Sequence, residues 1–189
     1  MTEYESEVRF FIEDIGEFKR NLSKLNAKTI YGYEFSDHYF KPRKIEWNPL
    51  YKTIRLREWF KPKRECEVIF NRVEIVHDEI PFKRSLYPEG KIILYRGDFD
   101  LCSKFLTDLE FEEWFTIEKK NCELVEVPKP NFKLVYEQVK GLGWIGELET
   151  SGKDPKKVKE NFAKWLSVLK VRATYKPLSI IYAEKMGLL

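Results

Sequence analysis

Apolar and polar positions recur along the chain with two different periods. Side chains alternate between the two faces of a strand, whereas apolar residues three or four apart share one face of a helix. Period-two patterns predict strands over residues 3–12, 27–42, 52–60, 65–75, 90–98, 112–127, 132–139 and 144–150. Helical spacing predicts helices over residues 15–26, 99–109 and 155–170, and a short last helix between Pro177 and Gly187.

The order of these elements repeats once. When the first half is shifted by 84 positions, Phe11 aligns with Tyr95 and Leu22 aligns with Leu106. Each half then consists of a strand, a helix and several antiparallel strands, and no low-complexity linker separates the halves. We therefore predict one domain over residues 1–189, with two pseudo-symmetric halves that share one sheet.

Several predicted strands carry charged side chains at every second position and apolar side chains between them. The charged positions are Glu3, Glu5, Glu7, Arg9, Arg55, Arg57, Lys133, Glu137, Glu147 and Glu149. A sheet with one wet face would explain this alternation. A sheet that closes on itself, with its apolar face covered by helices, would instead direct the charges into a common interior. A barrel of about eight strands leaves room there for side chains and one small ligand.

The types of charge indicate what such an interior would bind. Carboxylates suit hard divalent cations such as Mg²⁺ or Mn²⁺, and a guanidinium can hold phosphate oxygens with two parallel hydrogen bonds. A metal-bound polyphosphate needs both kinds of group. The whole chain has 34 Lys and Arg against 31 Asp and Glu, and its net charge of +3 is too small to favour nucleic acid.

Composition narrows the class of protein further. The 189 residues include three cysteines without a CxxC pair, which is typical of reduced thiols in an intracellular protein. His38 and His77 are the only histidines, so a site built from several histidines is excluded. No signal-peptide pattern is present, and no apolar run approaches the ~20 residues of a membrane helix. We predict a soluble, cytoplasmic protein without a membrane partner, either a monomer or a homodimer.

Four motifs resemble those of the CYTH superfamily, the triphosphate tunnel metalloenzymes, which includes class IV adenylyl cyclases and thiamine triphosphatases. The stretch ESEVR, with Glu5, Glu7 and Arg9, is similar to the ExExK signature of that superfamily. SDHYF resembles its D-x-Y-F segment, TIRLRE its arginine-rich strand, and YEQVKGLGWIGELE its GLG turn followed by E-x-E. One departure is Asn71, which stands where the superfamily usually carries a lysine.

The resemblance implies an α+β fold: an antiparallel, eight-stranded, closed or nearly closed barrel with helices packed outside it. It implies Mg²⁺ or Mn²⁺ at Glu5, Glu7, Glu147 and Glu149, and substrate phosphates at Arg9, Arg55, Arg57, Lys119 and Arg84. It implies catalytic roles for Glu137 and Lys120, although strand parity does not decide which of the adjacent Lys119 and Lys120 faces inward. The arginine-rich fourth strand of the superfamily is poorly matched in this sequence, and Arg84 and Lys91 are the nearest basic residues that could take its place.

The expected activity is metal-dependent hydrolysis of a triphosphate, such as inorganic triphosphate, thiamine triphosphate or a nucleotide. The same residues would serve a cyclase that forms cAMP from ATP, and Asn71 favours a third possibility, a module that binds polyphosphate with little turnover. An RNA-binding barrel would use Trp47, Trp59 and Trp144 to stack bases, but the carboxylates would repel its phosphates.

Overall fold

The computed structural model describes residues 4–46, 48–77, 81–87, 90–129 and 131–189, and most of them lie in strands. The strands are β1 (Tyr4–Ile12), β2 (Lys28–Pro42), β3 (Lys52–Lys61), β4 (Glu65–Val76), β5 (Phe82–Ser85), β6 (Ile92–Gly97), β7 (Phe111–Val127), β8 (Phe132–Val139), β9 (Gly143–Gly152) and β10 (Ala173–Thr174). The helices are α1 (Ile15–Lys24), α2 (Phe99–Asp108), α3 (Pro155–Leu169) and α4 (Leu178–Lys185).

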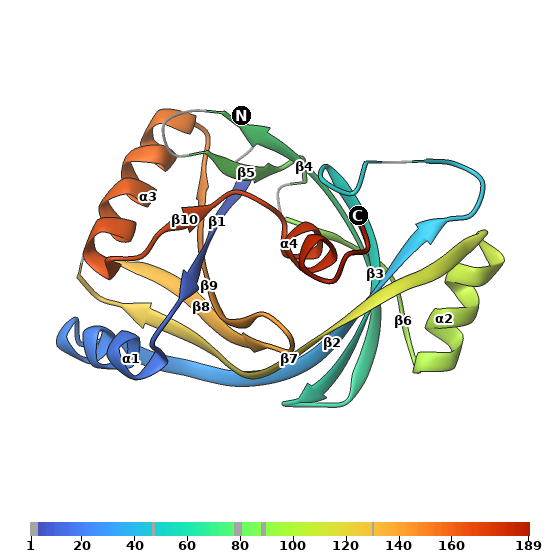
Figure 1. Cartoon of the computed structure of the whole chain (residues 1–189), viewed down its shortest axis with the longest axis horizontal. Helices are drawn as coiled ribbons and strands as arrows, with labels where there is room; N and C mark the ends of the chain where they lie inside the picture. Colours follow the sequence, from blue (N-terminus) through green and yellow to red (C-terminus); the bar gives the residue numbers. More distant parts are fainter. Residues whose placement is uncertain (1–3, 47, 78–80, 88–89, 130) are drawn as a thin grey trace.

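Eight of the described strands form a closed antiparallel ring (Figure 1). Their order is β1, β5, β4, β3, β2, β7, β8 and β9, and pairing of β9 with β1 closes the ring. The predicted α+β fold with a closed sheet is confirmed. The ring is uneven, because β4 pairs with β6 through Cys66–Phe70 and with the short β5 only through Val73–Val76.

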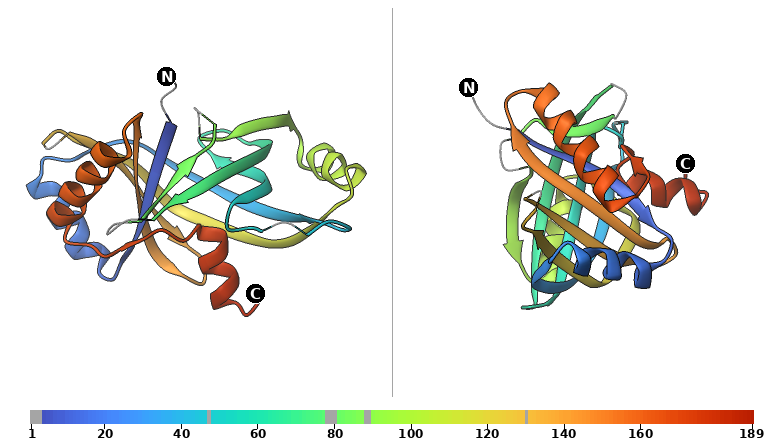
Figure 2. Two further views of the ribbon diagram at one scale, coloured as in Figure 1. Left: turned by 90° about the horizontal axis from the view of Figure 1, so that it is seen from above. Right: turned by 90° about the vertical axis from the view of Figure 1, so that its left-hand side faces the viewer.

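The apolar face of the ring lies outside and is covered by helices (Figure 2). Val8 and Phe10 of β1 are fully buried in a cluster that includes Phe18 of α1 and Phe162 of α3. On the other side of the ring, Leu56 of β3 packs in a cluster with residues of α2. Because side chains alternate along a strand, burial of these residues outside directs their charged neighbours into the ring.

Aspartates fix where three of the helices begin. The carboxylates of Asp14, Asp98 and Asp154 accept hydrogen bonds of 2.8–2.9 Å from backbone amides in the first turns of α1, α2 and α3. Such caps satisfy amides that have no acceptor inside the helix, and Pro155 adds a preformed first turn to α3. These residues explain why the predicted helix starts agree with the structure.

The two halves interlock. β1 of the first half pairs with β9 of the second, and β6 of the second half pairs with β4 of the first. Two strands were not predicted, the two-residue β10 and β5. β5 occupies the segment after Pro81, where the polar sequence indicated only a connection. Its four residues bridge β4 and β1, so this short strand is needed to close the ring.

None of the described helices is both long and apolar enough to cross a membrane.

Candidate functional site

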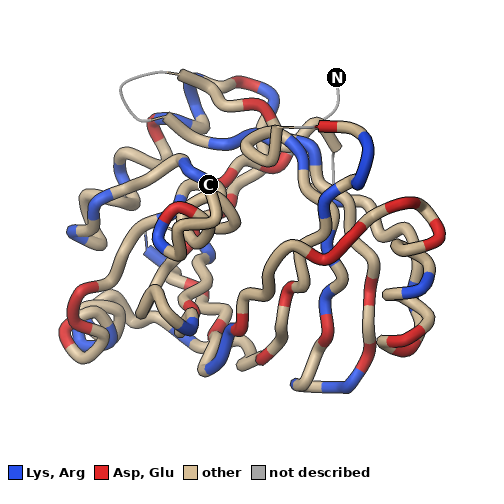
Figure 3. The backbone as a smooth tube through the Cα atoms, turned by 45° about the vertical axis from the view of Figure 1, so that its right-hand side comes forward, with Lys and Arg blue, Asp and Glu red and all other residues tan. Residues whose placement is uncertain are grey.

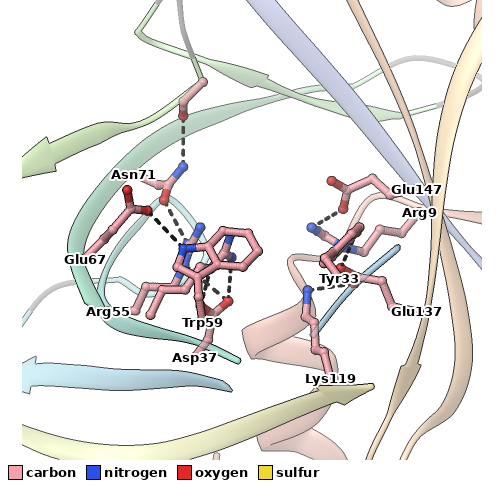
Figure 4. Close-up of polar contacts among 12 residues, drawn as sticks. Arg9, Tyr33, Asp37, Arg55, Trp59, Glu67, Asn71, Lys119, Glu137 and Glu147 are labelled. Atoms are coloured by element: carbon pink, nitrogen blue, oxygen red, sulfur yellow. Dashed lines mark hydrogen bonds and ion pairs between the residues drawn. The ribbon is translucent and has the colours of Figure 1, made fainter. Parts of the chain in front are cut away.

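The inner face of the ring encloses a cavity of about 330 Å³. Its charged lining consists of Glu5, Glu7, Asp37, Glu137, Glu147, Glu149, Arg9, Lys52, Arg55, Arg57, Lys83, Lys91 and Lys119. Figure 4 shows two polar groups that face each other across the ring, one around Asp37 and Arg55 and the other around Arg9 and Lys119. Charges of both signs from distant parts of the chain therefore converge on one cavity.

Three carboxylates meet at one wall of the cavity. Glu5 and Glu7 of β1 and Glu149 of β9 each bring one oxygen within 4.8 Å of the other two. The β1–β9 register places Glu7 opposite Glu149. Glu5 lies against Gly90, whose φ is +75°, and a Cβ added to that glycine would lie 2.0 Å from Glu5 Oε1. The glycine therefore supplies both an unusual backbone angle and the space for this carboxylate.

Two of these three carboxyl groups have raised pKa values. Burial is the largest cause of the raised pKa of Glu5, and the charge of Glu147 adds to it, while Lys91 and Lys83 oppose it. Burial also raises the pKa of Glu149, followed by the charges of Glu147 and Glu5. Ionised carboxylates this close repel one another, and a divalent cation with a preference for oxygen ligands would relieve that repulsion. The donor set fits Mg²⁺ or Mn²⁺.

Two cations lie beside the carboxylates. The Lys83 ammonium pairs with Glu7, and the side chain of Lys83 is only 4% exposed. Burial lowers the pKa of Lys83 to about 8, although Glu147 and Glu149 act in the opposite direction. The Arg9 guanidinium pairs with Glu147 and also lies 3.3 Å from Glu7 Oε1. Glu147 is thus bound to Arg9, and it lies beside the three clustered carboxylates, where it interacts with Glu149.

Asp37 organises the opposite wall. Its two carboxylate oxygens accept hydrogen bonds of 2.7 and 2.8 Å from Nε and NH2 of Arg57, and Oδ2 lies 3.3 Å from Nε of Arg55. Burial alone would raise the pKa of Asp37, but the two guanidinium groups hold it well below its usual range. The guanidinium carbon of Arg57 also lies 3.8 Å from the centre of the Phe35 ring. Both arginines are therefore fixed before any ligand binds.

Asn71 connects this wall to the loop that holds Glu5. Its carbonyl oxygen accepts a 2.8 Å hydrogen bond from Arg55, and its amide donates a 2.9 Å hydrogen bond to the carbonyl of Gly90. Its neighbour Arg72 is exposed. A neutral amide therefore occupies the position at which the CYTH resemblance leads us to expect a lysine, and it orients Arg55 instead of adding charge.

A further polar contact joins β7, β8 and β2 around Glu137. The ammonium of Lys119 donates a 2.7 Å hydrogen bond to Oε2 of Glu137, and the hydroxyl of Tyr33 donates a 3.0 Å bond to Oε1. All three residues are buried. Since each oxygen of Glu137 already accepts one hydrogen bond, this carboxylate holds the Lys119 cation in place at the cavity wall.

Comparisons with known proteins extend the fold assignment. No protein-family profile and no curated protein matches the sequence. Solved structures do match across almost the whole chain. A protein of Pyrococcus horikoshii is 19% identical, covers 96% of this chain and 99% of its own, and has a TM-score of 0.74. The chain shares its fold.

Two further neighbours carry functional names. A protein of Vibrio parahaemolyticus, proposed to be an adenylate cyclase, is 12% identical, covers 97% of this chain and 99% of its own, and has a TM-score of 0.71. A proposed adenylyl cyclase from Hippeastrum, described as having a dominant triphosphatase activity, is also 12% identical. It covers 98% of this chain and 96% of its own, with a TM-score of 0.58. At these identities the likeness establishes the fold alone.

Most of the residues predicted from the sequence line the one cavity. They are Glu5, Glu7, Arg9, Arg55, Arg57, Lys119, Glu137, Glu147 and Glu149. The structure separates them into the carboxylate group of Glu5, Glu7 and Glu149 and the ion-paired groups described above. Lys91, considered as a substitute for a missing basic strand, also lines the cavity, and burial lowers its pKa.

Two predicted residues lie elsewhere. Lys120 is exposed and pairs across the ladder with Gln138, because β7 turns Lys119 inward and the next side chain outward. Arg84 is not among the cavity residues, and it approaches Glu74 at 3.5 Å. The same alternation places its neighbour Lys83 inside. The catalytic role predicted for Lys120 and the phosphate contact predicted for Arg84 do not fit these positions.

The sequence reasoning missed Asp37, Lys83 and Tyr33. Asp37 shares strand parity with Tyr33 and Phe35, which also line the cavity, but aromatic residues at those positions do not by themselves reveal which face of the strand is inward. Lys83 lies in β5, which was not predicted. In the sequence, the only indication of Lys83 was that a basic residue follows Pro81 closely.

The tryptophans proposed for stacking bases do not form one platform. Trp59 lines the cavity and its indole N–H lies 3.3 Å from Glu67, while Trp144 packs at the edge of the apolar cluster that contains residues of α1. Trp47 lies outside the described residues. Acidic and basic positions are interspersed along the chain in Figure 3, which gives no support to a basic nucleic-acid face.

Proposed function

We propose that this protein is a metal-dependent hydrolase of triphosphate-containing substrates, which it binds in the cavity of the ring. The observation that carries the proposal is the meeting of Glu5, Glu7 and Glu149 within 4.8 Å, in the same cavity as several basic side chains. A bare anion would be repelled by the carboxylates, and a bare cation would leave the arginines without a ligand. A phosphate chain with a bound divalent cation satisfies both.

The basic side chains would hold the phosphate chain. Arg55, Lys83, Lys91 and Lys119 reach the cavity from four different strands or connections, so they can neutralise oxygens along an extended ligand. Lys119 is fixed by Glu137, and Arg55 by Asn71, which limits the entropy lost when a ligand binds. The cavity of about 330 Å³ is at the lower end of the range for small-molecule sites.

Glu5, Glu7 and Glu149 would hold Mg²⁺ or Mn²⁺. When bound, the ion would polarise a phosphoryl oxygen and neutralise charge that develops during transfer. Phosphoryl transfer depends mainly on such positioning and electrostatic stabilisation, so the chain needs no nucleophilic side chain for an attack by water. Arg9, which pairs with Glu147 next to the cluster, would stabilise charge on the oxygens at the reacting phosphorus.

Phosphate release from tripolyphosphate, ATP and thiamine triphosphate, with Mg²⁺ or Mn²⁺, tests the proposal. Adjacent lysines on β7 give a matched pair of variants, since Lys119 is buried at the cavity and Lys120 is exposed. We expect Lys119→Ala to reduce release at least 10-fold and Lys120→Ala to leave it within about twofold, because one hydrogen bond to a charged group contributes about 1.5–3 kcal/mol. Equal effects of the two substitutions, or no release by the unaltered protein with any substrate, would refute it.

Binding without turnover is the second candidate. Two observations favour it: Asp37 pairs with both Arg55 and Arg57, and residue 71 is a neutral asparagine. The positive charge available to a ligand in the cavity is therefore smaller than the number of basic residues suggests. Tight binding of tripolyphosphate without phosphate release would select this function. Formation of cAMP and pyrophosphate from ATP would instead select a cyclase.

A further inference from the structure

The first turn of α4 forms part of the cavity wall. Pro177, Leu178 and Ser179 line the cavity together with Arg55 and the other charged residues. The helix lies across one opening of the ring in Figure 1. Stacking of Tyr182 on Phe115, with ring centres 5.5 Å apart, fixes it there. The start of α4 is therefore a rigid part of the site and not a loose terminal segment.

This helix start carries amides without acceptors. The first amides of a helix have no partner within it. In α1, α2 and α3 an aspartate side chain supplies one, but Pro177 precedes α4 and gives no side-chain cap, and the first turn of α4 contains no acidic residue. The amides of Leu178 and Ser179 and the positive end of the helix dipole are thus presented to the cavity that these residues line.

Ser179 is a second, independent sign of a ligand. It is only 1% exposed, and its hydroxyl makes no hydrogen bond to any other residue within the described part of the chain. The hydroxyl oxygen is not among the fully enclosed unpaired atoms of the described residues, so it borders the cavity that Ser179 lines and is free to donate a hydrogen bond to a ligand there. The Nε of Arg55, on another wall of the same cavity, is enclosed without a hydrogen bond among the described residues, although it lies 3.3 Å from Asp37 Oδ2 in an ion pair.

We infer that the start of α4 and the Ser179 hydroxyl form an oxyanion subsite, which takes an oxygen of the phosphate chain at the α4 end of the cavity. This inference rests on the proposed binding of triphosphate. The Ser179 hydroxyl and the amides of α4 donate hydrogen bonds to one phosphoryl group, while the carboxylate cluster and its metal hold another part of the chain. The anion thereby serves as the cap that α4 lacks.

Isothermal titration of the purified full chain with tripolyphosphate and Mg²⁺ tests the subsite. Ser179→Ala removes only the hydroxyl, and we expect it to weaken binding roughly 10- to 100-fold, the range for one hydrogen bond to a charged group. The control is Ser36→Ala on β2, because Ser36 is also buried but does not line the cavity. It should leave the affinity within about twofold.

Ser179→Asp separates a binding role from a structural one. A carboxylate in the first turn of a helix favours the fold through the dipole, but it would occupy the oxyanion subsite. We expect this variant to keep or raise the melting temperature and to lose tripolyphosphate binding. Unaltered affinity in both Ser179 variants, with binding intact in the parent protein, would overturn this inference alone. Absence of binding in the parent protein would overturn the proposed function as well.

Discussion

Replacement of Asp37 by asparagine should reveal how strongly the buried arginines depend on their counter-ion. Asp37 is 1% exposed and Arg57 is 9% exposed, and the two form a bidentate pair with Arg55 close by. Asp37→Asn keeps the shape of the side chain but leaves two guanidinium groups without a negative charge. Removal of one partner from a buried pair costs about 3–5 kcal/mol. For a chain of this size that corresponds to a melting temperature lower by roughly 6–20 °C.

An added anion should reverse this loss. Thermal unfolding of Asp37→Asn would be followed with increasing tripolyphosphate, whose oxygens can replace the missing carboxylate at Arg55 and Arg57. A ligand that binds only the folded state stabilises it by RT ln(1 + [L]/Kd), so the variant should gain more than the unaltered protein at equal ligand concentration.

The control for the anion effect is Glu67→Gln. Glu67 is also buried, but its partner Arg96 is 64% exposed and can turn to water. This variant should lose less stability and should show no additional gain from tripolyphosphate. The reasoning is refuted if Asp37→Asn unfolds within about 1 kcal/mol of the unaltered protein, or if tripolyphosphate stabilises both proteins equally.

Three further predictions concern the metal site, acid and the core. Mg²⁺ or Mn²⁺ at 100 times its Kd should stabilise the protein by about 2.7 kcal/mol, and Glu149→Gln should lose most of this gain in thermal unfolding. The pKa of Asp37 is lower in the folded protein than its value of about 3.9 in the unfolded chain. The ion pairs of Asp37 therefore stabilise the fold fully above about pH 3.9, and this stabilisation is lost as the pH falls toward the folded-state pKa. The stability difference between the parent protein and Asp37→Asn should therefore narrow below about pH 4, and a difference that stays constant in acid would contradict this. Gly146→Ala should cost about 1–3 kcal/mol in urea unfolding, because a Cβ there would lie 2.1 Å from the ring of the fully buried Phe10. A Cβ added at Gly32 would make only an ordinary 3.5 Å contact with the carbonyl of Cys122, so Gly32→Ala should cost less.

Sequence patterns predicted an element or a residue's orientation correctly where the polarity pattern and the capping residues were unambiguous. The helix predicted over residues 99–109 corresponds to α2, because Asp98 caps its start and apolar residues recur on one face. In the middle of β1 and β3 the consecutive inward positions are charged, and the buried outward positions are apolar or small, so parity placed Glu7 and Arg55 correctly on the cavity side.

The patterns failed where both faces of a strand are mixed. On β2 the inward face carries Phe35, Asp37 and Tyr39, while the outward face carries His38 and the buried Phe40, so alternation of polarity does not reveal which face is inside. β5 has only four residues, too few for a period to emerge, and its position depends on pairing with β4 and β1. Its inward Lys83 could be found only from the tertiary structure.

Closure of the ring through β1 and β9 also has a consequence during synthesis on the ribosome. Glu7 emerges early, and its ladder partner Glu149 follows after most of the chain has been made. At typical elongation rates the delay is on the order of 10 s. Throughout that interval β1 lacks the neighbour that completes the acidic cluster, and its apolar face lacks α3. The nascent chain therefore lacks the complete acidic cluster until β9 is translated, and until then the edge of β1 that β9 will cover has unpaired backbone groups.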